Sequence, residues 1–456
     1  MNSFIVYGLI MGVLGLATLR RPGTAFGGVV CMFAIEEWSQ GSNPFFLRYH
    51  ALTNLLIGVF VLLGLVAQFF RRNLFSGISL KLTLWIILLF AYAFMSVAWS
   101  PRPDLSMEVW GAHSAYVLTE IVLAPLLLCR QADFRDAMGT IAILGSVLTL
   151  LLLYTVKWEY RYIVLAYQGD NVIHGNPLVP AQVAGCALFA VLFAKPRRLR
   201  LMRPLVKWSI IGFCLLLMVR TGSRGQVLGA VIAMMAAWPV AVRMKNAGSY
   251  LSIVLGVAVV LGICYEAYES YWMTRENRGL ADRWGGEGMG KDISGRLDSA
   301  FILLGHWADN PLAVFLGLGN SASYDPKILG IYPHFVPLEI LGEEGLIGFG
   351  LFLWIMYLSL RNIRAGFKEI STDESLRRTF GTYFAIFVYL FILSLKQGSL
   401  VGNVLMFTFL IVMDRFKGAT VIEKARPAVS SRKRHSHERT LPLVPSSLPR
   451  PPARGV

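Results

Sequence analysis

The sequence predicts an all-α polytopic integral membrane protein with about twelve or thirteen transmembrane helices and one large extracytoplasmic loop. Of its 456 residues, 55% are hydrophobic and only 15% are charged, whereas soluble globular domains carry about 25% charged residues. Apolar runs of roughly 17 to 22 residues recur along most of the chain, and this length matches the hydrocarbon core of a bilayer. No short alternating segments typical of a membrane β-barrel are visible.

The apolar runs place the predicted spans in order along the chain. They lie near residues 3–19, 23–37, 51–69, 80–99, 110–128, 136–155, 178–194, 205–219, 225–242, 250–268, 345–360, 380–395 and 399–414. The first run lacks a basic n-region and a small-residue cleavage site, so we expect a retained span rather than a signal peptide. The second run contains several glycines and ends in Glu36 and Glu37. It is either a span or a re-entrant or interfacial segment, which leaves the total open.

The distribution of basic residues predicts the orientation. The formal net charge of +16 could suggest a nucleic-acid partner, but the Lys and Arg residues concentrate in alternate connections and in the tail. Cations in short loops are retained on the cytoplasmic side of the membrane. The basic connections contain Arg20 and Arg21, Arg71 and Arg72, Arg130 and Arg135, the residues between Lys195 and Lys207, Arg243, and the residues between Arg361 and Arg378. We therefore predict a cytoplasmic C-terminus, an outer N-terminus and no nucleic-acid partner.

Three regions follow from this pattern. Residues 1–204 form N-terminal transmembrane helices, and residues 205–414 form a core that includes an extracytoplasmic loop, 269–335. Residues 415–456 are rich in Arg, Pro and Ser and are expected to be a disordered cytoplasmic tail. This tail either contacts anionic lipid or is simply solvated.

The long loop contains a segment with apolar residues at helical spacing, Ser294–Asn310. Its apolar positions are Leu297, Phe301, Leu304 and Trp307. The spacing predicts an amphipathic helix that lies near the membrane surface, in an ordered cap.

Two arginines break the orientation rule. Arg220 and Arg224, in MVRTGSRGQV, lie in a tight turn between two spans on the predicted outer face. An arginine at membrane depth costs about 2.5 to 3.5 kcal/mol on insertion scales, so it usually lines a polar cavity or meets a partner. Guanidinium groups bind phosphate oxygens, and Gly222 and Gly225 allow backbone N–H groups to approach the same anion. The alternative is an interfacial arginine with a carboxylate partner.

Two further residues are candidates for chemistry. Arg296, in SGRLD, is either an ordinary loop arginine or another ligand for an anion. His334, in IYPHFVPLEILGEEGLIGFG, lies where the outer loop meets a span, and an imidazole there can accept a proton from a sugar hydroxyl. The alternative is a packed or solvated side chain. Weaker histidine candidates are His50, His113, His174 and His306. Glu120, inside a span, is either a cavity residue or the partner of a buried cation.

The five cysteines predict neither a disulfide framework nor a zinc site. They are Cys31, Cys129, Cys186, Cys214 and Cys264. All lie in or beside apolar runs, without a CxxC pair or a cluster with histidine. We expect no cofactor.

Three segments resemble the C-terminal core of the bacterial O-antigen ligase and O-antigen polymerase superfamily. They are TGSRGQ after a span, GRLDSAFILLGHWADNPLAVFLGLGNS in the outer loop, and PHFVPLEILGEEGLIG leading into the next span. The resemblance covers about residues 205–360 and implies a GT-C-like membrane glycosyltransferase. Such an enzyme transfers a glycan from a polyprenyl diphosphate carrier to an acceptor hydroxyl, without a metal, on the periplasmic face of the bacterial cytoplasmic membrane. One departure is Phe335, because the family often has Asn after the histidine.

The resemblance also implies roles for individual residues. Arg220, Arg224 and Arg296 would hold the diphosphate, and His334 would act as general base in a displacement that inverts the anomeric centre. Supporting positions are Ser223, Gly225, Glu339 and Glu344. The acceptor stays open between a lipid, a glycan and a protein, which correspond to a ligase, a polymerase and a protein O-oligosaccharyltransferase.

Two other function classes remain. A transporter or flippase for lipid-linked sugars would also need a cationic cavity, but such transporters usually contain internal repeats. No repeat of the TGSRG or PHF segments is visible in the N-terminal half. The other class is a non-catalytic assembly protein that uses the cap as a docking surface.

Overall fold

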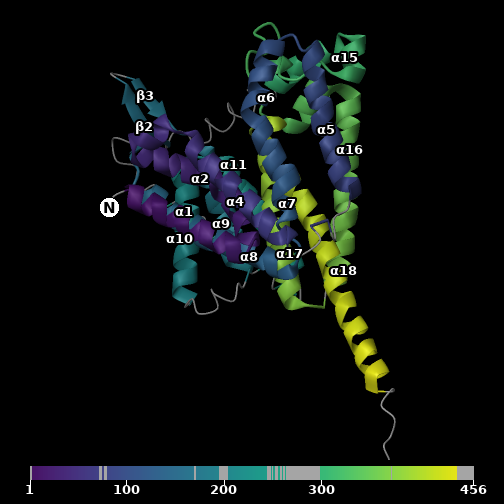
Figure 1. Cartoon of the computed structure of the whole chain (residues 1–456). Helices are drawn as coiled ribbons and strands as arrows, with labels where there is room; N and C mark the ends of the chain where they lie inside the picture. Colours follow the sequence, from purple (N-terminus) through teal and green to yellow (C-terminus); the bar gives the residue numbers. More distant parts are fainter. Residues whose placement is uncertain are drawn as a thin grey trace, which may run out of the picture.

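The computed structural model is a bundle of helices with a small sheet near one end (Figure 1). It describes residues 3–70, 74–75, 80–168, 171–194, 204–243, 298–370 and 372–438, and isolated positions between 248 and 266. Within these residues, seven helical segments are long and apolar enough to cross a membrane. They are α1 (Ser3–Arg20), α4 (Ala51–Phe69), Lys81–Trp99, α8 (Gln131–Tyr154), α11 (Arg224–Ala241), α16 (Val336–Ile370) and α17 (Glu374–Ser394). The prediction of a helical polytopic membrane protein is confirmed at this level.

The remaining helices are shorter, less apolar or interrupted. Lys81–Trp99 consists of α5 (Leu80–Met95) from its second residue onward, followed by η1 (Ser96–Trp99). The others are α2 (Gly23–Ser42), α3 (Pro44–Arg48), α6 (Pro103–Val117), η2 (Leu118–Leu123), α7 (Ala124–Leu126), α9 (Leu178–Phe193), α10 (Pro204–Arg220), α15 (Pro311–Leu316), η5 (Ala322–Tyr324), η6 (Val401–Asn403) and α18 (Val404–Glu438). Helices α2, α9, α10 and α18 each overlap a run predicted to be a span. The predicted span at 250–268 lies largely outside the described residues.

Helix α2 is continuous through the two glutamates that raised the question of a re-entrant segment. Most of its residues are buried, and it runs to Ser42. The Glu36 carboxylate accepts hydrogen bonds from the side chains of Gln40 and Asn54, at 2.9 and 3.0 Å. Glu37 Oε1 accepts the backbone N–H of Asn176 at 2.6 Å. Internal partners for these carboxylates allow the helix to continue past them inside the bundle.

Two glycines let α2 and α8 pack closely. A Cβ atom at Gly23 would lie 2.9 Å from Asp133 Cα, and one at Gly27 would lie 2.6 Å from Thr140 Cβ and 2.9 Å from the Ala137 carbonyl oxygen. The two glycines are four residues apart on one face of α2, the spacing that allows close helix contact inside membranes.

In the chain, α8 is followed by a three-stranded antiparallel sheet and then by α9. This sheet was not predicted from the sequence. Its strands are β1 (Trp158–Glu159), β2 (Tyr162–Gln168) and β3 (Asn171–His174), in the order β1-β2-β3. The sheet is short, and Ile163 and Val164 are its buried positions. Three strand residues in a row, Tyr162, Ile163 and Val164, carry β-branched or aromatic side chains that favour extended backbone. The chain is therefore mainly, but not purely, α-helical.

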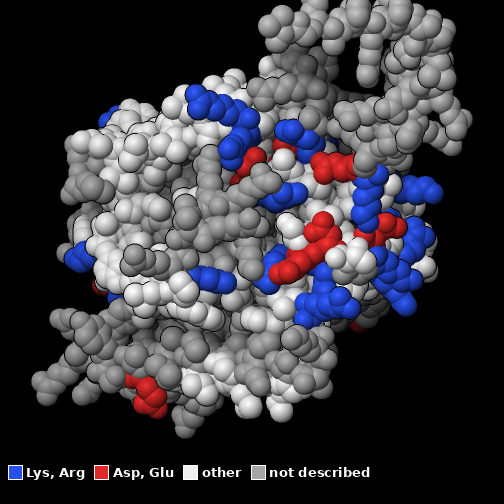
Figure 2. Space-filling view, turned by 90° about the horizontal axis from the view of Figure 1, so that it is seen from below, with Lys and Arg blue, Asp and Glu red and all other residues white. Residues whose placement is uncertain are grey.

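Side-chain contacts join one set of connections, which we call the basic end. Arg21 pairs with Asp136 at 3.1 Å. Lys424 pairs with Glu369 at 3.8 Å, and Arg377 donates to the Pro239 carbonyl at 3.0 Å. Figure 2 shows Lys and Arg side chains gathered on this face, with fewer acidic ones among them. The opposite set of connections, which we call the hairpin end, carries the sheet and the turns at residues 221–223 and 395–403.

The buried Arg415 ties α18 to the basic end. Its Nε donates to the Leu128 carbonyl at 2.6 Å, and its Nη2 donates to the Leu74 carbonyl at 2.6 Å. Beyond it, α18 continues to Glu438, with Ala419 and Thr420 buried. The prediction of a disordered tail from residue 415 onward is therefore wrong for the first part of this stretch, which is helical. Small and apolar side chains at helical spacing, such as Ala419, give it a buried face. Residues 439–456 lie outside the described residues.

The described part of the long loop contains a helix at residues 298–308. Its buried positions are Ala300 and Leu303, whereas Phe301 is 65% exposed. Leu303 packs at Gly342 of α16, where a Cβ atom would lie 2.8 Å from the leucine Cγ. The helix is thus present where an amphipathic helix was expected, but it turns a different face inward. Leu297 of the predicted stripe lies outside the described residues.

Candidate functional site

The TGSRGQ segment forms the tight connection between α10 and α11. Gly222 has a φ of +63°, a left-handed conformation that glycine adopts without steric cost. The Thr221 hydroxyl donates to the Met218 carbonyl at 2.8 Å, and Gly222 N–H donates to the Val219 carbonyl at 2.9 Å. These bonds close the end of α10 and let α11 begin at Arg224.

Arg220 holds the sheet against the bundle. Its Nη1 donates to the Tyr160 carbonyl at 2.7 Å, and its guanidinium carbon lies 5.4 Å from the centre of the Trp158 ring. Tyr160 itself has a φ of +56°, which is uncommon for a residue with a side chain. Arg220 therefore stabilises the connection between β1 and β2.

Arg224 contributes a buried cationic nitrogen at the start of α11. Its Nη1 is buried and has no hydrogen-bond partner among the described residues. A buried guanidinium nitrogen without a partner is costly unless an anion or water completes it. Its position on the first turn of a helix adds the positive end of the helix dipole.

Lys396, at the end of α17, reaches the same turn. Its Nζ lies 3.5 Å from Ser223 Oγ. A Cβ atom at Gly225 would lie 2.8 Å from that Nζ, so only glycine leaves room for the lysine side chain. The sequence reasoning did not select Lys396, although the same signal was available. In SLKQGS it is a cation in a predicted outer connection between two spans.

The turn at residues 395–403 joins two of the three family-like segments. On one side, Gln226 Nε2 donates to Gln397 Oε1 at 3.4 Å, and Tyr389 OH donates to Gln226 Oε1 at 3.0 Å. On the other side, Leu400 N–H donates to Glu339 Oε1 at 3.1 Å. TGSRGQ and PHFVPLEILGEEG are therefore connected through a single turn.

Three buried carboxylates follow His334 at the start of α16. Glu339 keeps one oxygen, Oε2, without a hydrogen-bond partner among the described residues. Glu343 binds the loop backbone, because its Oε2 accepts Ser321 N–H at 2.7 Å and its Oε1 accepts Ser323 N–H at 3.0 Å. The third carboxylate, Glu344, accepts the side-chain amide of Asn320 at 3.2 Å.

Asn320, in the GLGNS part of the loop, connects this cluster to the N-terminal half. Its backbone N–H donates to Ser96 Oγ at 2.9 Å, and its carbonyl accepts Ser100 Oγ at 2.7 Å. Its side-chain oxygen accepts Trp110 Nε1 at 3.2 Å. The family-like loop is thus fixed by a polar network in which Glu344 is one member.

His334 lies on strained backbone beside Tyr332. Its φ is +58°, a conformation that costs a residue with a side chain free energy and often occurs at functional sites. The imidazole centroid lies 4.0 Å from the Tyr332 ring, which lies 6.2 Å from the Tyr324 ring. Burial, together with the nearby Glu339 and Glu343 carboxylates, raises the pKa of the Tyr324 hydroxyl to about 12.

The structure brings only some of the predicted site residues together. Ser223 and Gly225, which flank Arg224 in the chain, contact Lys396, and Glu339 binds the same turn. Arg220 contacts the sheet, Glu344 contacts Asn320, and His334 contacts Tyr332. Arg296 lies outside the described residues, so its relation to the other arginines stays a prediction.

In comparisons with known proteins, no family model and no curated protein matches the chain. Within the described part of the chain, no group of three or more His, Cys, Asp or Glu side chains is arranged to hold a metal ion. The connection between α10 and α11 carries the buried Nη1 of Arg224, and Lys396 contacts Ser223 and Gly225 on either side of it.

Proposed function

We propose that this protein is a membrane glycosyltransferase of the O-antigen ligase type. It would move a glycan from a polyprenyl diphosphate carrier to an acceptor hydroxyl on the outer face of a bacterial cytoplasmic membrane. The observation that carries the proposal is the meeting of TGSRGQ with Lys396 and, through the same turn, with Glu339. Family-like segments far apart in sequence thus meet at one turn, where Lys396 contacts the two residues that flank Arg224.

The diphosphate is the natural ligand for this cationic pair. Arg224 offers a buried donor nitrogen, and Lys396 offers a compact charge that is fixed beside Gly225. Guanidinium and ammonium groups both bind phosphate oxygens, the first through paired N–H groups and the second as a point charge. Arg220 and Arg296 stay as predicted further ligands of the diphosphate.

The proposed reaction is a direct displacement. His334 takes the proton of the acceptor hydroxyl, and the acceptor oxygen forms a bond to the anomeric carbon. The bond between that carbon and the phosphate oxygen breaks, and the electron pair leaves on the diphosphate. Arg224 and Lys396 stabilise this developing charge, which is the step where fixed cations accelerate the reaction. The product of an inverting transfer is polyprenyl diphosphate.

The same site is compatible with related activities. A polymerase would use a second repeat unit as the acceptor, and a protein O-oligosaccharyltransferase would use a serine or threonine hydroxyl. A flippase for lipid-linked sugars would also bind the diphosphate, but it would not break the bond to the sugar. A non-catalytic assembly protein would need neither His334 nor the cationic pair.

Reconstitution with a labelled lipid-linked oligosaccharide tests the proposal. We expect wild-type protein to release polyprenyl diphosphate and to transfer the label to an acceptor. Arg224→Gln should lower the transfer rate by about a hundredfold or more, because one donor to the developing charge is lost. His334→Ala should lower it by a factor of roughly 10² to 10⁴.

Arg102→Gln is the matched control, because it removes a cation from the same end of the bundle. Arg102 is partly exposed and pairs with Asp104 at 3.3 Å. Near-normal rates in both Arg224→Gln and His334→Ala would defeat the assignment. Movement of the label across the bilayer without release of polyprenyl diphosphate would favour the flippase.

A further inference from the structure

A cavity of about 870 Å³ lies between α1 and α8, at the opposite end of the molecule from the site above. Both helices pack on α2, which closes the cavity from behind. Most of its lining is aliphatic, and several lining residues are exposed at its mouth. These exposed residues are Leu9, Val13, Leu16, Ile143 and Val147. A volume of this size is typical of ligand sites, and a mouth lined with exposed aliphatic side chains fits an acyl chain.

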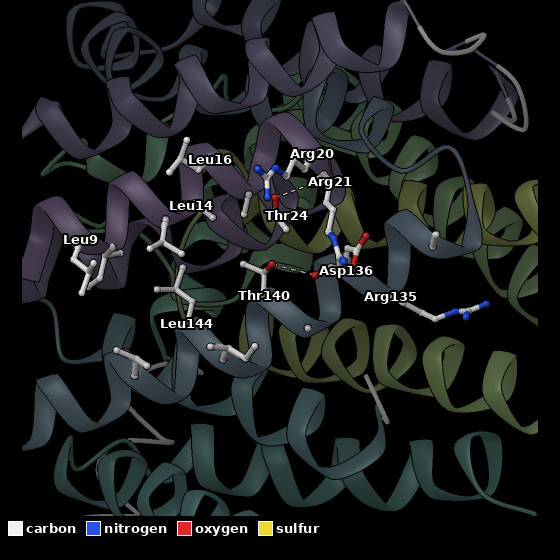
Figure 3. A pocket seen from close by; sticks show the side chains of 17 residues that line it. Leu9, Leu14, Leu16, Arg20, Arg21, Thr24, Arg135, Asp136, Thr140 and Leu144 are labelled. Atoms are coloured by element: carbon white, nitrogen blue, oxygen red, sulfur yellow. Dashed lines mark hydrogen bonds and ion pairs between the residues drawn. The ribbon is translucent and has the colours of Figure 1, made fainter. Parts of the chain in front are cut away.

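The polar groups that line the cavity lie at the basic end of the molecule. Figure 3 shows Arg20, Arg21 and Asp136 close to Thr24, while Leu9 lies farther along α1. Arg21 pairs with Asp136 at 3.1 Å. Arg20 is exposed and makes no hydrogen bond or ion pair with the described residues. Three arginines and one aspartate line the cavity, so this end carries an excess of positive charge.

The length of the cavity matches one leaflet of a bilayer. From Arg20 to Leu9 the helix rises by about 16 Å, and from Asp136 to Val147 it rises by the same amount. Half of a hydrocarbon core is about 15 Å. A lipid with its headgroup at Arg20 would therefore extend its chains along the aliphatic lining without crossing the midplane.

We propose that this cavity binds one anionic phospholipid of the leaflet at the basic end. Its phosphate would lie against Arg20 and Arg21, and an acyl chain would fill the space between α1 and α8. The excess of positive charge favours a lipid with a net negative charge, such as phosphatidylglycerol, over a zwitterionic lipid. Basic pockets between transmembrane helices are known to bind anionic headgroups. Arg135 also borders the cavity, but its guanidinium points away from Arg20 and is not needed here (Figure 3).

Lipid exchange on the full-length protein tests the proposal. Detergent-solubilised protein is incubated with phosphatidylglycerol and phosphatidylcholine of identical acyl chains, and bound lipid is measured by native mass spectrometry. We expect wild-type protein to retain the anionic lipid with a preference of about fivefold or more, and Arg20→Gln to bring the ratio close to one. Arg361→Gln is the charge-matched control, because Arg361 is exposed at the basic end on α16 and lies outside the cavity.

A second variant tests the acyl part independently of charge. Ala17→Trp places a large ring in the cavity and should reduce retention of both lipids, whereas Ile5→Trp, outside the lining, should not. Equal retention of the two lipids by wild-type protein would overturn the proposal. So would equal loss of the preference in Arg20→Gln and Arg361→Gln. Inorganic phosphate at millimolar concentration should not displace the lipid, and displacement would identify a simple anion site instead.

Discussion

At the scale of single residues, the pairing of Gly225 with Lys396 is the most specific feature of the site. The lysine side chain occupies the space that a Cβ atom at Gly225 would need, with Cε only 2.5 Å from that position. A methyl group there must displace the lysine rather than the helix backbone. The two residues therefore act as one unit.

This coupling predicts a non-additive mutant cycle. Lys396→Ala should lower the transfer rate by about a hundredfold, as expected for the loss of one charge-stabilising donor. Gly225→Ala should lower it strongly in wild-type protein and only slightly in the Lys396→Ala background. The measurement is kcat/KM for the lipid-linked donor in all four proteins. Equal effects of Gly225→Ala in the two backgrounds would show that the lysine position is unimportant.

Two substitutions of His334 can separate the effect of backbone strain on stability from the effect of the imidazole on activity. Its φ of +58° costs little for glycine but more for alanine. We expect His334→Gly to be about 1 kcal/mol more stable than His334→Ala, while both lack transfer activity. Thermal unfolding in detergent measures the first difference and the reconstituted reaction measures the second. Equal stability of the two variants would mean that the left-handed conformation is not maintained.

At the scale of elements, the contact of α2 with α8 depends on the missing side chain at Gly27. Gly27→Leu would force a side chain against Thr140 and the Ala137 carbonyl, and overpacking of this kind costs about 1 to 3 kcal/mol. Gly12→Leu is the matched control, because no atom lies within 4 Å of a Cβ atom at Gly12. A fall in melting temperature for Gly27→Leu alone is expected. A similar fall in both variants would point to a general intolerance of leucine in these helices.

Much of the helical organisation could be predicted, because a run of apolar residues long enough to cross a bilayer has few alternatives to a helix. The predicted range 51–69 coincides with α4. The sheet at residues 158–174 could not be predicted in this way, because its strands are short and the connection between β1 and β2 is held by Arg220 from a distant helix. The inward face of the helix at residues 298–308 was also missed. The helix packs on Gly342 through the face that carries Ala300 and Leu303, and Phe301 is left exposed.

The candidate site was partly predictable for a related reason. Arg224 violates the charge bias of its connection, and such a violation is visible in one sequence. Lys396 violates the same bias, but a lone lysine gains meaning only when α17 brings it to Ser223. Contacts between residues more than a hundred positions apart are decided by packing, which no local pattern contains.

At the scale of the whole molecule, the contacts separate the connections into two ends but do not choose which end faces the cytoplasm. The excess of cations predicts that the basic end does. Cys31, Cys129, Cys186 and Cys214 are buried, and Cys264 lies outside the described residues, so the labelling is done in a Cys264→Ser background, where introduced thiols should dominate. We expect Glu108→Cys to react with a membrane-impermeant maleimide in intact cells, and Arg361→Cys to react only after the membrane is opened. The reverse pattern would place the cationic pair on the cytoplasmic side.

The network around Asn320 has a consequence for how this chain can be divided. Its partners Ser96, Ser100 and Trp110 precede the boundary at 204, while Glu344 follows it. A fragment that began at residue 205 would expose polar atoms which the intact chain keeps paired, and the loop before α16 would lose its anchor. Attempts to express the C-terminal half alone should therefore yield material that regains its shape only when the missing half is supplied as a second polypeptide.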